Sequence, residues 1–417
     1  MKSQDSGLLA GRLGALSERN FRLFFAGYTT SLIGSAMVPV ALSFAVLDQG
    51  RPATDVGYVL AADTVPLVVL LLLGGVIADR FSRRVSMLGS DVFRCATEAL
   101  LAALLLTATP PLWVLVVLAG ALGVGQAFFN PAMTGLMPQL VSAQRLQQAN
   151  ALRGTAVSGG QILGPSLAGV LVAVAGPGWA IAIDSASFAV SAACLYRLDI
   201  PPRPRSGPAS ALSQLAEGWS AFRSRSWLWS IVAQFATFNA LSFAPFMVLG
   251  AVIAHDQLGG AGAWGAILAV FGAGSILGGL AATRIHPRRP LVLATLGAAL
   301  FAAPLALIAI PTTTAIIAIG AGLAGAGLAI FGALWETALQ QNVPGEVLSR
   351  VSAYDWFGSV AFVPLGYILA GPLASNLGIH TTLFLAAGWA ATSCAAVLAI
   401  PSVRNLRPSS LNTPTAA

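Results

Sequence analysis

Twelve long apolar stretches dominate this sequence and limit what the chain can fold into. They cover roughly 21–47, 56–78, 86–107, 111–137, 152–175, 178–198, 227–253, 262–283, 290–310, 312–339, 351–374 and 380–400. Each is about as long as the ~20 residues that a helix needs to cross a bilayer. Only 9% of the residues are charged, against roughly 25% in soluble domains. The pattern predicts an all-α membrane protein with twelve transmembrane helices, because the segments are long and lack the alternation of membrane strands.

The basic residues fall almost entirely on one side of these predicted spans. With the N-terminus in the cytoplasm, 20 of the 22 Lys and Arg residues are cytoplasmic, while Arg51 lies outside and Arg94 lies within a span. Cytoplasmic loops of membrane proteins carry an excess of Lys and Arg. We therefore predict a multi-pass protein of the cytoplasmic (inner) membrane with both termini in the cytoplasm. This orientation accounts for the net charge of +7, and no nucleic-acid partner is expected.

One long connection divides the spans into six and six. Residues 199–226 are first Pro-rich and basic and then amphipathic around Trp219 and Phe222, which predicts a cytoplasmic linker with a surface helix. The predicted domains are an N-terminal six-helix bundle over 1–198, the linker over 199–226, a C-terminal six-helix bundle over 227–403 and a cytoplasmic tail over 404–417.

A weak internal repeat relates the two halves. Gly75-x-x-x-Asp79-Arg80 with Arg83-Arg84 follows the second span, and Gly279-x-x-x-Thr283-Arg284 with Arg288-Arg289 follows the eighth. Parallel six-helix repeats are typical of transporters that bind substrate between their halves. The two bundles are therefore predicted to be pseudo-symmetric.

Several kinds of chemistry find no support in the sequence. The only lysine is Lys2, so the phosphate-binding G-x-x-x-x-G-K-[ST] of an ATP-driven pump is absent. The three cysteines are scattered through apolar stretches, the three histidines are predicted in loops, and no H-E-x-x-H is present. An enzyme, a cofactor and a metal site are therefore not expected.

Two motifs resemble those of the major facilitator superfamily. Gly75-Val-Ile-Ala-Asp79-Arg80-Phe-Ser82-Arg83-Arg84 is similar to the superfamily's signature between spans two and three, with Ser82 where the family prefers glycine. Gly160-Gln-Ile-Leu-Gly164-Pro165-Ser-Leu-Ala168-Gly169 resembles the antiporter signature of span five, with Ala168 replacing a glycine. Further stretches resemble the drug:proton antiporter branch, which includes macrolide efflux and enterobactin export proteins. They are Asn20-Phe-Arg-Leu-Phe, Phe129-Asn130-Pro131-Ala132, Ala149-Asn-Ala-Leu152 and Arg350-Val-Ser352 with Pro364-Leu-Gly366.

The resemblance implies the major facilitator fold and a role for each motif. Asp79, with Arg80, Arg83 and Arg84 nearby, is implied to form a gating charge network at the cytoplasmic end of span two; the alternative is that these arginines only set orientation. The glycines of span five with Pro165 form either a plain packing face or a pliable helix at the moving interface between the halves, since both need close backbone approach.

Ionisable residues inside spans are costly and usually functional. A carboxyl that carries a coupling proton must alternate between its neutral and ionised forms. The proton-coupling candidates are Asp63, Glu98 and Glu336, of which Asp63 and Glu336 rank higher because Glu98 lies one turn from Arg94. Asp91 and Arg94 are predicted to form a structural charge pair. For Asp184, Glu336 and Asp355, solvation near a helix end is the alternative.

In the resembled fold, spans one, four, seven and ten line the substrate cavity. The cavity candidates on these spans combine aromatic and amide side chains, which suits a bulky amphipathic ligand; they are Tyr28, Gln126, Phe129, Asn130, Gln234, Phe238, Asn239 and Trp335. We therefore predict a monomeric secondary transporter that exports drug-like or siderophore-like amphiphiles by alternating access, coupled to protons or another cation. The alternatives are a facilitator that imports a polar metabolite and a membrane sensor or lipid-handling protein without transport activity.

Overall fold

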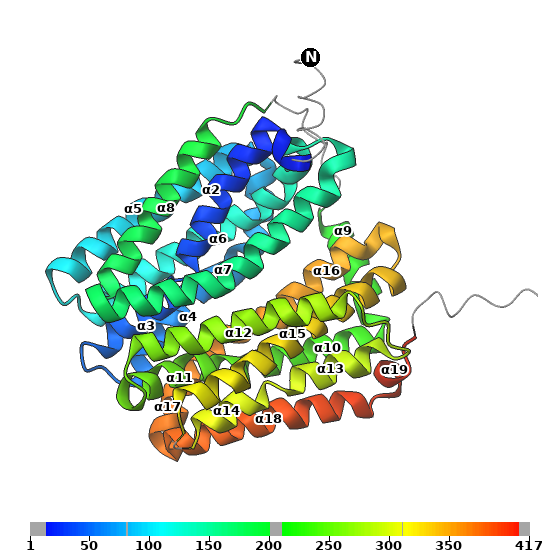
Figure 1. Cartoon of the computed structure of the whole chain (residues 1–417). Coiled ribbons are helices and arrows are strands. Elements are labelled where there is room, and N and C mark those ends of the chain that lie inside the picture. Colours follow the sequence, from blue (N-terminus) through cyan, green and yellow to red (C-terminus); the bar gives the residue numbers. More distant parts are fainter. Residues whose placement is uncertain (1–13, 81, 201–210, 311, 408–417) are drawn as a thin grey trace, which may run out of the picture. The chain divides into compact units, whose positions relative to one another are not determined.

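The computed structural model describes residues 14–80, 82–200, 211–310 and 312–407, and within these ranges the ordered elements are all helical (Figure 1). The chain divides into two compact units. Unit 1 comprises Met1–Gly50 and Ala62–Arg205, and unit 2 comprises Arg51–Ala61 and Ser206–Ala417. Helix α4 (Ala53–Arg80) therefore begins in unit 2 and continues in unit 1.

The other helices of unit 1 are joined by short connections. They are η1 (Gly14–Ser17), α2 (Arg19–Ser35), α3 (Val38–Leu47), α5 (Arg83–Thr107), α6 (Leu112–Leu140), η2 (Ala143–Arg145), α7 (Leu146–Ala175) and α8 (Pro177–Tyr196). Unit 2 also consists of helices joined by short connections, and the first helix of its C-terminal segment is the linker helix α9. Its helices are α9 (Ala211–Arg223), α10 (Ser226–Phe238), η3 (Asn239–Phe243), α11 (Ala244–Gln257), α12 (Ala261–Ala282), α13 (Pro290–Ala299), α14 (Ala302–Ile308), α15 (Thr314–Asn342), α16 (Gly345–Val360), α17 (Val363–Leu377), α18 (Ile379–Ala399) and α19 (Pro401–Arg404).

The described residues contain eleven helical segments that are long and apolar enough to cross a membrane. Helix α5 supplies a twelfth by length, with 25 residues, but it carries Asp91, Arg94 and Glu98 and is correspondingly less apolar. The predicted all-α membrane fold is confirmed. The three ionisable residues of α5 must be accommodated inside the protein, because lipid would leave them unsolvated.

The first span of each set of six is interrupted near its middle. In unit 1, α2 ends at Ser35 and α3 begins at Val38. In unit 2, a π-helical segment over Asn239–Phe243 separates α10 from α11. Such interruptions free backbone groups from the regular hydrogen-bonding pattern and are frequent at functional sites.

Small residues bring the helices of unit 2 into close contact. A Cβ atom added to Gly274 of α12 would overlap the backbone of Gly322 on α15, and one added to Gly278 would overlap the backbone of Ala326. In membranes, helices associate through close packing rather than through a hydrophobic driving force between them. The α12–α15 contact therefore depends on the missing side chains.

We expect Gly274→Ala to destabilise unit 2 by about 1–3 kcal/mol, the usual cost of overpacking. The control is Gly279→Ala on the same helix, where an added Cβ meets no atom within 4 Å and alanine improves helix propensity. Thermal unfolding in detergent measures both variants. Equal melting temperatures for the two would show that α12 and α15 do not pack through Gly274.

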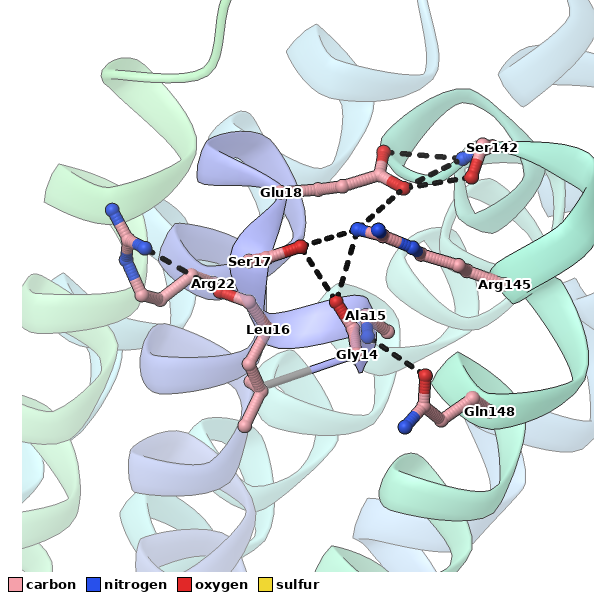
Figure 2. A network of polar contacts seen from close by, with 9 residues as sticks. All are labelled: Gly14, Ala15, Leu16, Ser17, Glu18, Arg22, Ser142, Arg145 and Gln148. Atoms are coloured by element: carbon pink, nitrogen blue, oxygen red, sulfur yellow. Dashed lines mark hydrogen bonds and ion pairs between the residues drawn. The ribbon is translucent and has the colours of Figure 1, made fainter. Parts of the chain in front are cut away.

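The start of the described chain is tied to the connection between α6 and α7 (Figure 2). The Glu18 carboxylate accepts hydrogen bonds from the backbone and side chain of Ser142, at 3.1 and 2.8 Å, and lies 3.7 Å from the Arg145 guanidinium. Arg145 also donates to the Gly14 carbonyl at 3.1 Å and to Ser17. This network fixes the entry into α2 at the predicted cytoplasmic end of unit 1.

The amphipathic part of the linker forms α9, which packs on α16 within unit 2. Trp219 and Phe222 stack with their ring centres 5.6 Å apart, and both contact the Tyr354 ring. Glu217 forms an ion pair with Arg350. The linker is therefore anchored to the C-terminal unit by its aromatic face, and residues 201–210 of the predicted linker lie outside the described residues.

Candidate functional site

Two antiparallel helices of unit 1 bring their polar residues together. Asp91, Arg94 and Glu98 of α5 are spaced i, i+3 and i+7, and Asp184, Ser187 and Ser191 of α8 have the same spacing. All six side chains are buried. The Ser185 hydroxyl of α8 donates to the Cys95 carbonyl of α5 at 2.8 Å, which fixes the register between the helices. One polar face therefore lies against the other inside the bundle.

Arg94 is the cation of this cluster and is 8% exposed. Its guanidinium donates to the Ser35 hydroxyl at 3.2 Å and lies 3.9 Å from the centre of the Phe188 ring. No ion pair within 4.0 Å joins it to Asp91 in the described part of the chain. The structure thus places the two members of the predicted charge pair in one cluster, with Arg94 directed towards the end of α2, where partial negative charge favours a cation.

Glu98 and Asp184 meet across the helix pair. Glu98 is 1% exposed and Asp184 is fully buried, and the two carboxyl groups lie close enough to interact electrostatically. Ser187 donates to Asp184 Oδ1 at 2.8 Å, while Glu98 Oε2 and Asp184 Oδ2 are buried without a hydrogen-bond partner among the described residues. The alternative that Asp184 is solvated at a helix end is therefore wrong, and its partnership with Glu98 was not predicted.

Asp63 belongs to the same electrostatic environment. It lies on the part of α4 that belongs to unit 1, and the charges of Arg94 and Glu98 act on it. Its backbone carbonyl packs directly under Gly123 of α6, where an added Cβ would overlap it. Two of the three proton-coupling candidates, Asp63 and Glu98, are thus brought together.

Glu336, the third candidate, lies in unit 2 and its side chain is exposed in the structure. Its neighbour Trp335 is buried and donates an indole hydrogen bond to Asp355 Oδ2 at 3.0 Å. Glu336 lies close enough for its charge to act on Asp355. The histidines, all predicted in loops, differ in part: His255 lies in the last turn of α11 and His380 in the first turn of α18.

The motif after the second span continues α4 and begins α5. Gly75, Asp79 and Arg80 lie on the helical backbone of α4, and their side chains lie outside the described residues. Arg83 donates to the Gly135 carbonyl of α6, and Arg84 donates to the Leu195 and Tyr196 carbonyls at the end of α8. Ser82 caps α5 by accepting from the Val85 backbone N–H at 3.2 Å, in an extended conformation that does not require glycine.

The antiporter motif packs within unit 1. A Cβ on Gly164 of α7 would overlap Ala36 and the Ile33 carbonyl, and one on Gly160 would lie 3.2 Å from Leu32. Pro165 lies inside α7 and Gly169 is buried one turn further on. Gly160 and Gly164 therefore face the interrupted first span of their own bundle. The two glycines thus form a close packing contact within unit 1.

The predicted cavity residues divide between the two units. Tyr28 and Phe129 share an apolar cluster in unit 1, while Gln126 and Asn130 are half-buried on α6. In unit 2, Gln234 donates to Ser393 at 3.3 Å, Asn239 donates to the Ser359 carbonyl at 2.9 Å, and Phe238 packs against Phe235 and Phe301. Trp335 stacks on Phe331 and meets Trp227 edge-on. The Gln234 side-chain oxygen is buried without a hydrogen-bond partner among the described residues.

Solved structures share this fold. A mutant form of the nucleoside transporter NupG superposes with a TM-score of 0.72 over 91% of this chain and 99% of that chain, at 14% identity. A bacterial homologue of the human lysosomal transporter Spinster gives a TM-score of 0.70 over 93% of this chain and 96% of that chain, at 16% identity. These similarities show the fold.

Curated relatives match most of the sequence. Macrolide efflux protein A of Streptococcus pyogenes is 22% identical over 86% of this chain and 90% of that protein. Multidrug efflux pump Tap of Mycolicibacterium fortuitum is 29% identical over 87% of this chain and 91% of that protein. Enterobactin exporter EntS of Salmonella paratyphi A is 27% identical over 46% of this chain and 47% of that protein.

The family model of the Major Facilitator Superfamily matches residues 24–364, from the first span into the eleventh. The match includes both motifs that suggested the resemblance and both units of the structure. Together with the helical segments and the shared fold, it places the protein in a membrane as a multi-pass transporter. The chain belongs to the Major Facilitator Superfamily.

Proposed function

We propose that this protein is a secondary active transporter that exports drug-like or siderophore-like amphipathic molecules by alternating access, driven by protons. The observation that carries the direction of transport is the similarity to two efflux proteins over more than four-fifths of the chain. The acid–base cluster of α4, α5 and α8, whose members on α5 and α8 are buried, supports proton coupling, because membrane-embedded carboxyls mark proton relays in transporters.

The remaining roles follow from this proposal. The N-terminal bundle over 1–198 and the C-terminal bundle over 227–403 act as the two halves, joined by the linker 199–226, with both termini in the cytoplasm. The proposed substrate-binding residues are the aromatic and amide side chains of spans one, four, seven and ten. The protein works as a monomer, since each chain contains both halves.

Transport into everted membrane vesicles tests the function. An acidic vesicle interior supplies the proton gradient, and the panel contains a macrolide, a lipophilic cation and a catecholate siderophore. We expect accumulation of at least one compound that stops when a protonophore collapses the gradient. Accumulation that ignores the protonophore would contradict proton coupling, and uptake of polar metabolites alone would favour the facilitator.

Asp79→Asn is expected to reduce transport strongly without preventing membrane insertion. The substitution removes one negative charge from the proposed gating network beside Arg83 and Arg84, while asparagine keeps the size of the side chain. Initial rates in the same vesicles, normalised to the amount of protein, measure the effect. Wild-type turnover by Asp79→Asn at wild-type levels would show that the motif only sets orientation.

A further inference from the structure

The contact between Glu98 and Asp184 sets two carboxyl groups against each other in a buried place. Two ionised carboxylates in contact repel each other, and a medium of low dielectric constant strengthens that repulsion. In the described part of the chain, neither Glu98 Oε2 nor Asp184 Oδ2 has a hydrogen-bond donor. A proton shared between them removes the repulsion and supplies the missing donor.

The charged groups around this pair do not supply enough positive charge to neutralise both of its carboxylates. The charged groups on the surrounding elements are Asp63 on α4 and Asp91 and Arg94 on α5, while α2 contributes Ser35 and Gly34, which carry no charge. Four carboxyls therefore surround one guanidinium. Asp91 is fully buried and is the member of this cluster that lies three residues before Arg94 on the same helix.

Arg94 connects the pair to the interrupted span. Its guanidinium acts electrostatically on both Glu98 and Asp184, yet its hydrogen bond goes to Ser35, the last residue of α2. A protonated pair carries one negative charge and leaves Arg94 on α2. A pair that has lost its proton carries two negative charges, and it attracts the Arg94 guanidinium away from Ser35.

We propose that Glu98 and Asp184 bind one exchangeable proton between them, and that its release shifts Arg94 from the end of α2 to the acid pair. The bound form is a carboxylic acid that donates to a carboxylate, and release delivers H⁺ to water and leaves two carboxylates. The inference rests on the proposed function for its role in transport. It adds Asp184 to the proton-coupling candidates and makes Glu98 one half of a site.

A metal ion is not the ligand of this cluster in our proposal. In the described residues, no group of three or more His, Cys, Asp or Glu side chains is arranged to hold a metal ion.

Infrared spectroscopy of the purified protein in liposomes tests the pair without any substrate. A neutral carboxylic acid gives a carbonyl band that an ionised carboxylate lacks. We expect this band in the wild type and an equal decrease of it in Glu98→Gln and Asp184→Asn, because the remaining acid of the pair is then ionised opposite Arg94. The control is Asp55→Asn, whose carboxylate pairs with Arg51 at 3.5 Å and should leave the band unchanged.

A band of unchanged intensity in both single variants, or a decrease only in Asp91→Asn, would overturn the shared site. If Glu98→Gln and Asp184→Asn do not fold, the wild type is labelled instead with a hydrophobic carbodiimide. This reagent reacts with neutral buried carboxyls. Modification of Glu98 or Asp184 supports the pair, and modification only elsewhere refutes it.

Transport measurements separate this inference from the proposed function. Glu98→Gln and Asp184→Asn should lose accumulation driven by the proton gradient but keep downhill exchange of substrate. If the infrared band behaves as expected and the wild type transports no amphiphile, the acid pair stands and the function is wrong. If the wild type pumps and both variants pump equally well, the pair is not the coupling site.

Discussion

Arg94→Met is expected to destabilise unit 1 by about 3–5 kcal/mol, the range found when one member of a buried charge cluster is removed. The variant leaves Asp63, Asp91, Glu98 and Asp184 without the cation that acts on all four. Protonation of these acids reduces their mutual repulsion. The loss should therefore be largest in alkaline buffer and smaller in acidic buffer, as thermal unfolding in detergent would show.

Two further variants make the Arg94→Met result specific. Arg22→Met removes the same group from an exposed position on α2 and should leave the melting temperature close to that of the wild type. Glu98→Gln added to Arg94→Met removes one uncompensated charge and should recover part of the stability. Equal destabilisation by Arg94→Met at both pH values would show that packing over Phe188, and not charge, explains the loss.

Gly164→Leu is expected to bring transport to background and to lower stability by more than the ~1–3 kcal/mol of an ordinary overpacked site. A single Cβ at this position already overlaps Ala36 and the backbone of α2, so a leucine cannot enter without separating α7 from α2. The damaged contact lies next to the interruption between α2 and α3. Melting temperature and vesicle transport measure the two effects.

Gly159→Leu is the matched control for stability, because an added Cβ at Gly159 of the same helix meets no atom within 4 Å. It should retain the wild-type melting temperature. A Gly164→Leu variant that is as stable and active as the wild type would mean that α7 does not pack on α2 through its glycines.

The spans could be predicted from the sequence because apolar length is a direct consequence of the bilayer thickness. The ends of the helices were predicted less accurately than the apolar spans where a helix extends beyond its apolar stretch. The predicted fifth span begins at residue 152, whereas α7 begins at Leu146, because its first turns are polar. Polarity ends an apolar stretch without ending a helix.

The interruptions of the spans were not predicted, although the sequence contains a signal for them. Pro39, Pro245 and Pro364 each stand at the first or second position of the helix that follows a break. Proline lacks a backbone N–H and is tolerated in the first turn of a helix. A proline within an apolar stretch therefore marks a restart that hydropathy alone does not show.

The acid–base cluster was predicted only in part, because proximity along the sequence is a poor guide to contacts between helices. Asp63 has no basic residue near it in the sequence, yet the charge of Arg94 acts on it in the fold. Asp184 was placed near a helix end, but the matching spacing of polar residues on α5 and α8 indicates that the two faces pair. That spacing is visible in the sequence and predicts the contact once the two helices are known to be antiparallel.

Proton movement during substrate exchange tests the central claim most directly. The purified protein is reconstituted into liposomes that contain a pH-sensitive dye, and a gradient of a transported amphiphile is imposed without any pH gradient. An antiporter must move protons opposite to the substrate, so the lumen should acidify as substrate leaves, and Glu98→Gln should abolish this change while substrate still moves. Substrate movement by the wild type with no change in luminal pH would contradict proton-coupled efflux.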